Sequence, residues 1–222
     1  MSTAQDSPKI RHKSKGEQTK GFILAAAIKV LARNGIKGTT HRAIALEANI
    51  QLSLTTYYFK DINQLVHEAF TLNSANVTAK AGAAWKLAFQ LIESYSKTEL
   101  RKVSTREALA DKLSAMSSIY LAEQITEQPT ELAVEQLLFT EIQITPELRS
   151  LAKQHKTLIL SPFIKLCRYF NKQDPELNAD IMLTMYKQIE YRNLADDFDE
   201  QKREEINKVT QRIIRWIMGL KS

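Results

Sequence analysis

Apolar residues recur along most of this chain every three or four positions, which is the period of an amphipathic helix. Residues 19–34 carry such a stripe, and Gly35 follows it as the expected left-handed helix end. The same period continues from about residue 74, and five Pro and six Gly leave few breaks. The pattern predicts an all-α chain of about nine helices that is long enough to bury a sizeable core.

The segment Thr40–Phe59, THRAIALEANIQLSLTTYYF, predicts two short helices around a tight turn. Thr40 can cap the first helix, and Asn49 stands where that helix must end, because Asn tolerates the left-handed backbone conformation. The second helix is expected to expose hydrogen-bonding side chains of little charge, namely Gln51, Ser53, Thr55, Thr56 and Tyr57. This is the pattern of a helix-turn-helix, whose second helix can lie in the DNA major groove.

Apolar and small residues around this segment follow a specific spacing, formed by Ile23, Leu24, Ala26, Ala27, Leu31, Gly35, Thr40, Ile44, Ala45, Ala48, Ile50, Phe59 and Leu65. With these positions, residues 20–70 resemble the DNA-binding domain of TetR/AcrR-type transcriptional regulators. Three residues depart from the family pattern. Asn49 replaces a turn glycine, Thr56 replaces a phosphate-contacting tyrosine, and Ile62 replaces a lysine. These departures concern individual DNA contacts more than the fold.

Positive charge is concentrated near the N-terminus. Residues 1–60 hold ten Lys/Arg and three Asp/Glu, whereas residues 61–222 hold twenty-one and twenty-two. A basic N-terminal quarter fits contact with a polyanion, although charge alone fits a solvated basic surface equally well. We expect three regions: a flexible basic arm (1–18), a helix-turn-helix DNA-binding domain (19–73), and a helical effector-binding and dimerisation domain (74–222). The arm could follow DNA or could simply be a solubilising tail.

The predicted DNA contacts fall into two groups. Thr40, Arg42 and Lys60 are expected to meet phosphates. The side chains expected to face base edges or the adjacent DNA backbone are Gln51, Leu52, Ser53, Thr55 and Tyr57. Thr56 occupies the position at which the family has a phosphate-contacting tyrosine. For any single one of these residues, a plain exposed surface remains an equal alternative.

The last two predicted helices carry apolar stripes. Along residues 199–220 the stripe steps by three and four through Ile206, Val209, Ile213, Trp216 and Leu220. The preceding helix carries Leu177, Ile181, Met185 and Ile189 at steps of four. Both stripes could be intramolecular core. In the TetR family, however, the final two helices pair with their copies across a two-fold axis. The resemblance therefore implies a homodimer that binds a pseudo-palindromic double-stranded operator.

The resemblance also implies a small-molecule pocket within the helices between about Trp85 and Tyr186. The candidate lining residues are Phe89, Tyr120, Gln124, Phe139, Glu141, Tyr169 and Tyr186, with His155 and Phe163 as further polar and aromatic positions. For each of them, an ordinary core or surface position is the favoured alternative. The sequence does not identify the effector.

Other kinds of site lack a motif. The four His are scattered without metal-ligand spacing, and Cys167, the only cysteine, cannot form an intrachain disulfide. We find no phosphate-binding glycine loop, nucleophile elbow or membrane-spanning apolar run. We therefore expect no cofactor, no metal, no enzymatic activity and no membrane partner. The prediction is a cytoplasmic transcriptional regulator, in this family more often a repressor, released from its operator by a small molecule. Two alternatives remain: a TetR-fold DNA-binding protein without an effector, and a helical protein-interaction adaptor.

Overall fold

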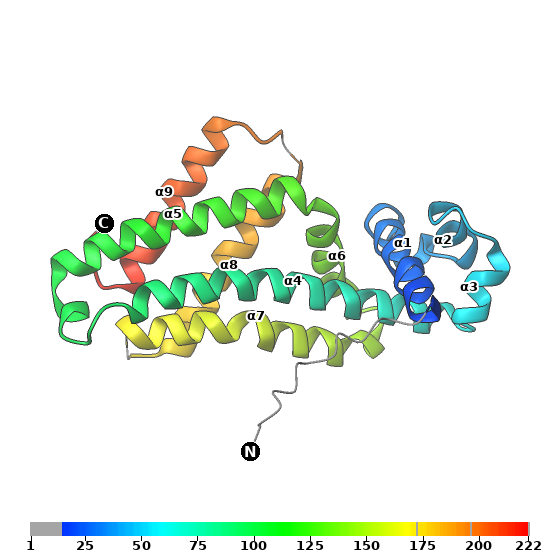
Figure 1. Cartoon of the computed structure of the whole chain (residues 1–222), viewed down its shortest axis with the longest axis horizontal. Helices are drawn as coiled ribbons and strands as arrows, with labels where there is room; N and C mark the ends of the chain where they lie inside the picture. Colours follow the sequence, from blue (N-terminus) through cyan, green and yellow to red (C-terminus); the bar gives the residue numbers. More distant parts are fainter. Residues whose placement is uncertain (1–14, 172, 196, 222) are drawn as a thin grey trace, which may run out of the picture. The chain divides into compact units, whose positions relative to one another are not determined.

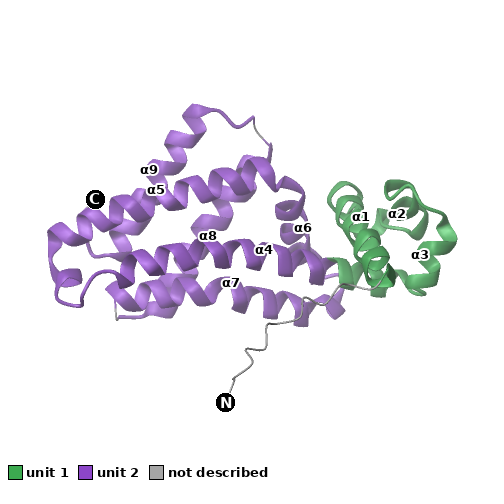
Figure 2. Cartoon of the chain, viewed as in Figure 1, with its two compact units in different colours: residues 1–69 green, residues 70–222 purple. Residues whose placement is uncertain are grey.

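The computed structural model describes residues 15–171, 173–195 and 197–221, and all regular structure in these residues is helical (Figure 1). The chain divides into two compact units, residues 1–69 and residues 70–222 (Figure 2). The predicted all-α fold is confirmed. None of the described helices is both long enough and apolar enough to cross a membrane.

Unit 1 is built on α1 (Lys15–Gly38), α2 (His41–Glu47) and α3 (Leu52–Tyr58). Helix α1 begins at Lys15 rather than at the predicted Thr19, whose hydroxyl instead donates to the Lys15 carbonyl oxygen at 3.0 Å. Residues 15–18 of the predicted flexible arm are therefore helical, and its other residues lie outside the described part of the chain.

Gly35 does not end α1 as predicted. Its backbone has φ 64° and ψ −175°, a conformation that suits glycine alone, and the helix bends there and adds a last turn to Gly38. The Thr39 hydroxyl donates to the Gly35 carbonyl oxygen at 2.7 Å, which satisfies an acceptor freed at the bend.

Helix α4 (Ile62–Glu93) is one continuous helix of 32 residues. It passes the unit boundary at residue 69 and the boundary predicted between residues 73 and 74. No Gly or Pro interrupts it there, and the side chains of Asn73 and Ser74 are buried against partners on other helices. Asp61 caps its start, because its carboxylate accepts from the Asn63 N–H at 2.9 Å.

The rest of unit 2 comprises α5 (Val103–Glu127), α6 (Pro129–Glu141), α7 (Arg149–Phe170), α8 (Pro175–Arg192) and α9 (Glu200–Ile217). Three short 3₁₀ turns join them: Glu99–Arg101, Pro146–Leu148 and Asn193–Ala195. Helix α5 begins at Val103. Helix α7 continues through Pro162 as one element.

The core of unit 2 forms where α5 packs against α9 and α7 packs against α8. Leu109 and Leu113 of α5 are buried, as the helical period predicts, and Ile214 and Ile217 of α9 join the same cluster. Cys167 also lies in this cluster. Burial, the main cause, raises the pKa of its thiol to about 11, which makes it a small core residue rather than a reactive thiol.

Candidate DNA-binding and ligand-binding sites

Unit 1 contains the predicted helix-turn-helix. The Thr40 hydroxyl caps α2 by accepting from the Ala43 N–H at 3.1 Å. Asn49 has φ 50°, and the turn closes when the Ile50 N–H donates to the Ala45 carbonyl oxygen at 3.0 Å. The predicted Thr40 cap and left-handed Asn49 are confirmed. Ile44 and Phe59, both completely buried, fix the two short helices in the core of unit 1.

Most predicted DNA-contacting side chains are exposed. The exposed fractions of Tyr57 and Leu52 are 76% and 43%, and the other exposed members of the set are Thr40, Arg42, Gln51, Ser53, Thr56 and Lys60. Within the described residues, neither Arg42 nor Lys60 forms an ion pair, so both remain available to phosphate. Helix α3 therefore exposes polar and apolar side chains that could meet base edges, and Arg42 and Lys60, unpaired in the part of the chain that the structure describes, lie close to it in sequence.

The prediction that Thr55 is exposed and faces DNA is wrong. Thr55 is completely buried, and its hydroxyl donates to the Leu52 carbonyl oxygen at 2.8 Å. It lies one helical turn before the buried Phe59, so its side chain faces the core rather than solvent. Thr55 is therefore not positioned to meet DNA. Tyr58 is half-buried rather than a full core residue, and its ring packs edge-on against Tyr57 with centroids 5.1 Å apart.

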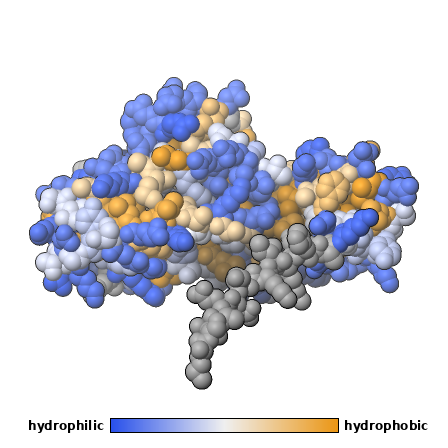
Figure 3. Space-filling model, in the orientation of Figure 1, coloured by the Kyte–Doolittle hydropathy of each residue, from blue (hydrophilic) through white to orange (hydrophobic). Residues whose placement is uncertain are grey.

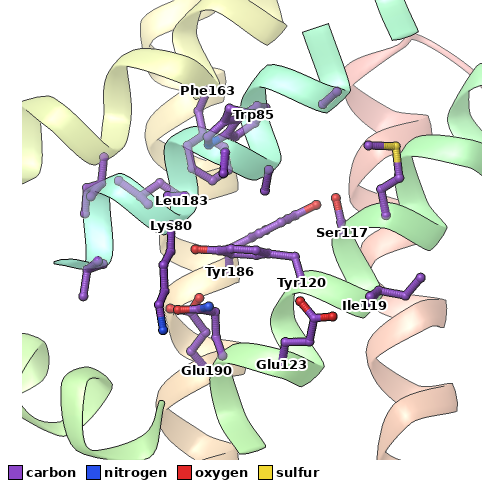
Figure 4. Close-up of a pocket in the computed structure, with 18 of the residues that line it drawn as sticks. Lys80, Trp85, Ser117, Ile119, Tyr120, Glu123, Phe163, Leu183, Tyr186 and Glu190 are labelled. Carbon is purple, nitrogen blue, oxygen red and sulfur yellow. The ribbon is translucent and has the colours of Figure 1, made fainter. Parts of the chain in front are cut away.

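Unit 2 contains a partly open cavity of about 570 Å³ between α4, α5, α7 and α8 (Figure 4). Four rings line it: Trp85, Tyr120, Phe163 and Tyr186. The Phe163 ring contacts Trp85 and Tyr186 edge-on, with centroid distances of 4.8 and 5.5 Å. The polar residues that line the cavity are Lys80, Ser117, Glu123, Gln124, Glu127, Gln128, Lys187 and Glu190. The volume is that of a site for a drug-sized molecule.

The structure places only some predicted pocket residues at this cavity. Tyr120, Gln124 and Tyr186 line it, as does Phe163. Phe89, Phe139, Glu141 and Tyr169 do not, which corrects the prediction for these four. The Phe89 ring stacks on Trp85, the Tyr169 hydroxyl donates to Glu93 at 2.8 Å, and the Phe139 ring lies against His155. These three aromatic rings serve packing.

A chain of buried polar side chains connects four helices of unit 2. Ser74 of α4 lies 2.7 Å from Nδ1 of His155 on α7, whose Nε2 lies 2.7 Å from Glu135 of α6. The other oxygen of Glu135 accepts from Lys187 of α8 at 2.8 Å, and Lys187 also donates to Glu190 at 2.7 Å. We call these five residues the polar relay. Lys187 and Glu190 line the cavity, so one end of the relay is open to a ligand.

Burial and charge act against each other in the polar relay. Burial disfavours ionised Glu135, but Lys187 and His155 outweigh it and hold the pKa of this carboxyl below its usual value. Burial and the neighbouring Glu135 carboxylate outweigh Lys187 at Glu190 and raise the pKa of that carboxyl. Burial also disfavours the Lys187 ammonium, but Glu190 and Glu135 raise its pKa well above its usual value. Within the relay, one lysine therefore lies within hydrogen-bond distance of two carboxyl groups.

The predicted dimer stripes separate into two groups. Ile206 and Ile213 are buried where α9 packs against α5, and Ile189 of α8 is buried in the same core cluster, so these three residues are core rather than available interface. Val209 and Leu220 are half-buried. Leu177, Ile181, Met185 and Trp216 are exposed by 60%, 42%, 43% and 45%. Apolar residues reach the surface at several places on the visible face (Figure 3).

The part of the chain that the structure describes brings together no group of His, Cys, Asp and Glu that could hold a metal ion. The sequence analysis missed Trp85, Lys187 and Glu190 as cavity residues. Glu190 follows Tyr186 by one helical turn, and this was the one signal that could have placed it on the same face.

Comparisons with known proteins agree with this architecture. Residues 23–69 match the family described as "Bacterial regulatory proteins, tetR family". No curated protein matches the chain. A solved structure from Mesorhizobium loti, described as a TetR-family transcriptional regulator, is 14% identical with a TM-score of 0.66, and the match covers 93% of this chain and 98% of that chain.

Two further structures share the fold. SCO1917 of Streptomyces coelicolor, a member of the TetR family, is 20% identical with a TM-score of 0.60, covering 90% of this chain and 98% of that one. The multidrug-binding protein EbrR, solved with ethidium, is 21% identical with a TM-score of 0.56, covering 88% and 98%. Residues 23–69 therefore form a domain of the TetR family of bacterial regulatory proteins, and the chain as a whole has the fold of the TetR-family structures.

Proposed function

We propose that this protein is a dimeric, sequence-specific transcriptional repressor whose operator affinity is set by a small molecule bound in the cavity of unit 2. The observation that carries the DNA-binding part is the exposed face of α3, with Leu52 and Tyr57 prominent and the basic side chains of Arg42 and Lys60 beside it. We propose repression rather than activation because repression is the commoner mode in the family that the chain resembles.

The ligand part of the proposal rests on the cavity. A filled core between α5 and α8 would favour a DNA-binding protein without an effector, whereas a space of about 570 Å³ favours one with an effector. Helix α4 supplies Val77 and Trp85 to the cavity wall, and the first residues of the same helix belong to unit 1. A ligand that prefers the DNA-incompetent arrangement would shift the dimer toward it, by no more than its differential affinity for the two arrangements.

Selection of binding sites from a random duplex DNA pool tests the DNA-binding part. We expect a pseudo-palindromic site whose affinity falls steeply with salt. If no sequence is enriched and binding is weak and equal on all duplexes, the specific-regulator proposal fails. An architectural or adaptor role would then be the better description.

Phosphate contacts can be counted on the selected site. Arg42→Ala and Lys60→Ala are each expected to lower the slope of log affinity against log salt by about one, since each removes one released counterion. Lys208→Ala is a control of equal charge change on α9, where Lys208 pairs with Glu204 at 2.7 Å. It should leave the slope unchanged. Unchanged slopes for both unit 1 variants would remove these residues from the interface.

The exposed apolar residues of α8 support the proposed homodimer. Replacing Ile181 by Arg is expected to halve the mass measured by light scattering, because a charge would be buried without a partner at a two-fold contact. Leu158→Arg makes the same change at an exposed apolar residue of α7 and should leave the mass unchanged. A dimer that persists in Ile181→Arg would place the contact elsewhere.

A further inference from the structure

Helix α8 brings one ammonium group, Lys187, and one carboxyl group, Glu190, to the cavity wall, and a second carboxyl group, Glu135 of α6, lies behind Lys187. Glu135 and Glu190 both accept from the Lys187 ammonium, at 2.8 and 2.7 Å, so a single cation is shared by two carboxylates. Glu190 is 2% exposed, and among these two carboxylates it is the one that lines the cavity. His155 lies on the far side of Glu135 and does not reach the cavity lining. A second cation at Glu190 would balance the pair.

The charges around the cavity rim do not reverse this balance. Glu123 and Glu127 are exposed lining residues that add two carboxylates, and Lys80 is an exposed lining residue that adds one ammonium. Lys187 is already occupied by its two carboxylate partners and is not free to hold an anion. Burying an anionic ligand beside Glu190 would place like charges together in a site of low polarity, which is costly.

Four aromatic rings and a larger number of aliphatic side chains form the apolar part of the lining. Figure 4 shows the Tyr120 ring crossing the cavity, with its hydroxyl end toward Glu190 and Lys80, and the Trp85 and Phe163 rings on the α4 and α7 side. Ring faces attract cations through their quadrupole, most strongly where water is excluded. They also give apolar area to the body of a ligand. A buried carboxyl group in a cavity that also offers aromatic rings is complementary to a positive charge on an apolar body.

We propose that the cavity binds a lipophilic organic cation, with its positive charge beside Glu190 and its apolar groups against Trp85, Tyr120 and Phe163. This names the chemical class of the effector and therefore rests on the ligand-controlled function proposed above. Lys187 is the cation that the chain itself supplies to Glu190, and the ligand adds a second cation beside the same carboxyl group.

Two further observations agree with this assignment. Glu190 is buried, and its carboxyl group already accepts from Lys187, so the protein fixes the position of the group that an added cation would meet. The Tyr186 hydroxyl is buried in the cavity wall without a hydrogen-bond partner of ordinary geometry. It provides a donor for a polar substituent on the ligand.

An isosteric pair of opposite charge tests the proposal. Tetraphenylphosphonium and tetraphenylborate share shape and apolar area, so calorimetric titration of the full chain with each, in the absence of DNA, isolates the sign of the charge. We expect the phosphonium to bind at least about tenfold more tightly than the borate. Borate binding that equals or exceeds phosphonium binding overturns the proposal, and so does the absence of binding by both.

Variants locate the charge. Glu190→Gln keeps an acceptor for Lys187 and is expected to weaken phosphonium binding about tenfold or more without weakening borate binding. Glu123→Gln makes the same charge change at an exposed lining residue and should alter affinity by less than about threefold, because solvent screens it. If Glu190→Gln fails to fold, Trp85→Leu provides the second test. Loss of the Trp85 ring should lower the ratio of phosphonium affinity to borate affinity by about fivefold. An unchanged preference in the folded variant counts against the proposal.

The two proposals fail in different ways. Operator selection without ligand tests regulation, and calorimetry without DNA tests the ligand class. If an operator is enriched but the cavity binds the borate more tightly, only the assignment of a cationic ligand is wrong. Phosphonium binding that depends on Glu190 in a protein with no enriched operator leaves the cation site standing and removes the regulator.

Discussion

Replacing Phe59 by alanine is expected to destabilise unit 1 by about 3–5 kcal/mol and to abolish operator binding. Phe59 is completely buried, directly follows α3, and donates its N–H to the Thr55 carbonyl oxygen at 2.9 Å. The Lys20 ammonium also lies over its ring, 5.1 Å from the centroid. A small domain of this kind has a net stability of only about 3–5 kcal/mol, so the loss is comparable with the whole.

Phe22→Ala is the matched control, because it removes the same side chain from an exposed position of the same unit. Phe22 is 55% exposed on α1, and we expect its removal to change stability by no more than about 0.5 kcal/mol. Hydrogen exchange of the α1–α3 amides measures unit 1 separately from unit 2. Comparable exchange in the two variants would mean that Phe59 does not anchor α3.

The helix-turn-helix was predictable because its signals are local. A threonine cap, an asparagine that accepts φ 50° and a buried phenylalanine after the second helix each act within a few residues of their own position. The same local rules misplaced Thr55. Exposure on a helix of seven residues depends on which face meets the core, and a short polar run does not specify that face.

The apolar stripes of α8 and α9 show a different limit. Ile206 and Ile213 have the spacing of a dimer seam, yet they are buried against their own chain, whereas Ile181 and Met185 with similar spacing are exposed. Periodicity identifies an apolar face but not the partner that covers it. The candidate pocket residues failed for a related reason, because aromatic side chains such as Phe89 and Tyr169 pack one layer away from the cavity.

The polar relay could not be predicted from sequence at all. Its five residues come from four helices, and Ser74 and Glu190 lie more than one hundred positions apart. No single helix carries a recognisable motif for it, and only His155 was considered as a polar position. Such networks arise from tertiary packing, so their consequences are tested in the folded protein.

Replacing Lys187 by methionine is expected to lower the free energy of unfolding of unit 2 by about 3–5 kcal/mol at neutral pH. The change leaves Glu135 and Glu190 buried together without the cation that both contact. Lys156→Met is the matched control. Lys156 pairs with Asp180 at 3.0 Å where both side chains are about half exposed, and its loss should cost no more than about 1 kcal/mol. Denaturant unfolding followed by tryptophan fluorescence measures both variants.

The pH dependence of this deficit identifies its cause. In the native chain the pKa of Glu135 lies below 4.5, so its contribution to stability is present above pH 4.5 and is lost as pH falls through the folded pKa. Without Lys187, burial raises the pKa values of both carboxyls, and the stability of the variant is lost as pH rises through them. The difference in the free energy of unfolding between the native and variant chains should therefore be larger at pH 7.5 than at pH 5.

Adding Glu190→Gln to Lys187→Met should recover part of the lost free energy of unfolding, since only Glu135 and His155 then remain as a buried pair. A deficit that is equal at both pH values would assign the loss to packing of the lysine stem instead of charge.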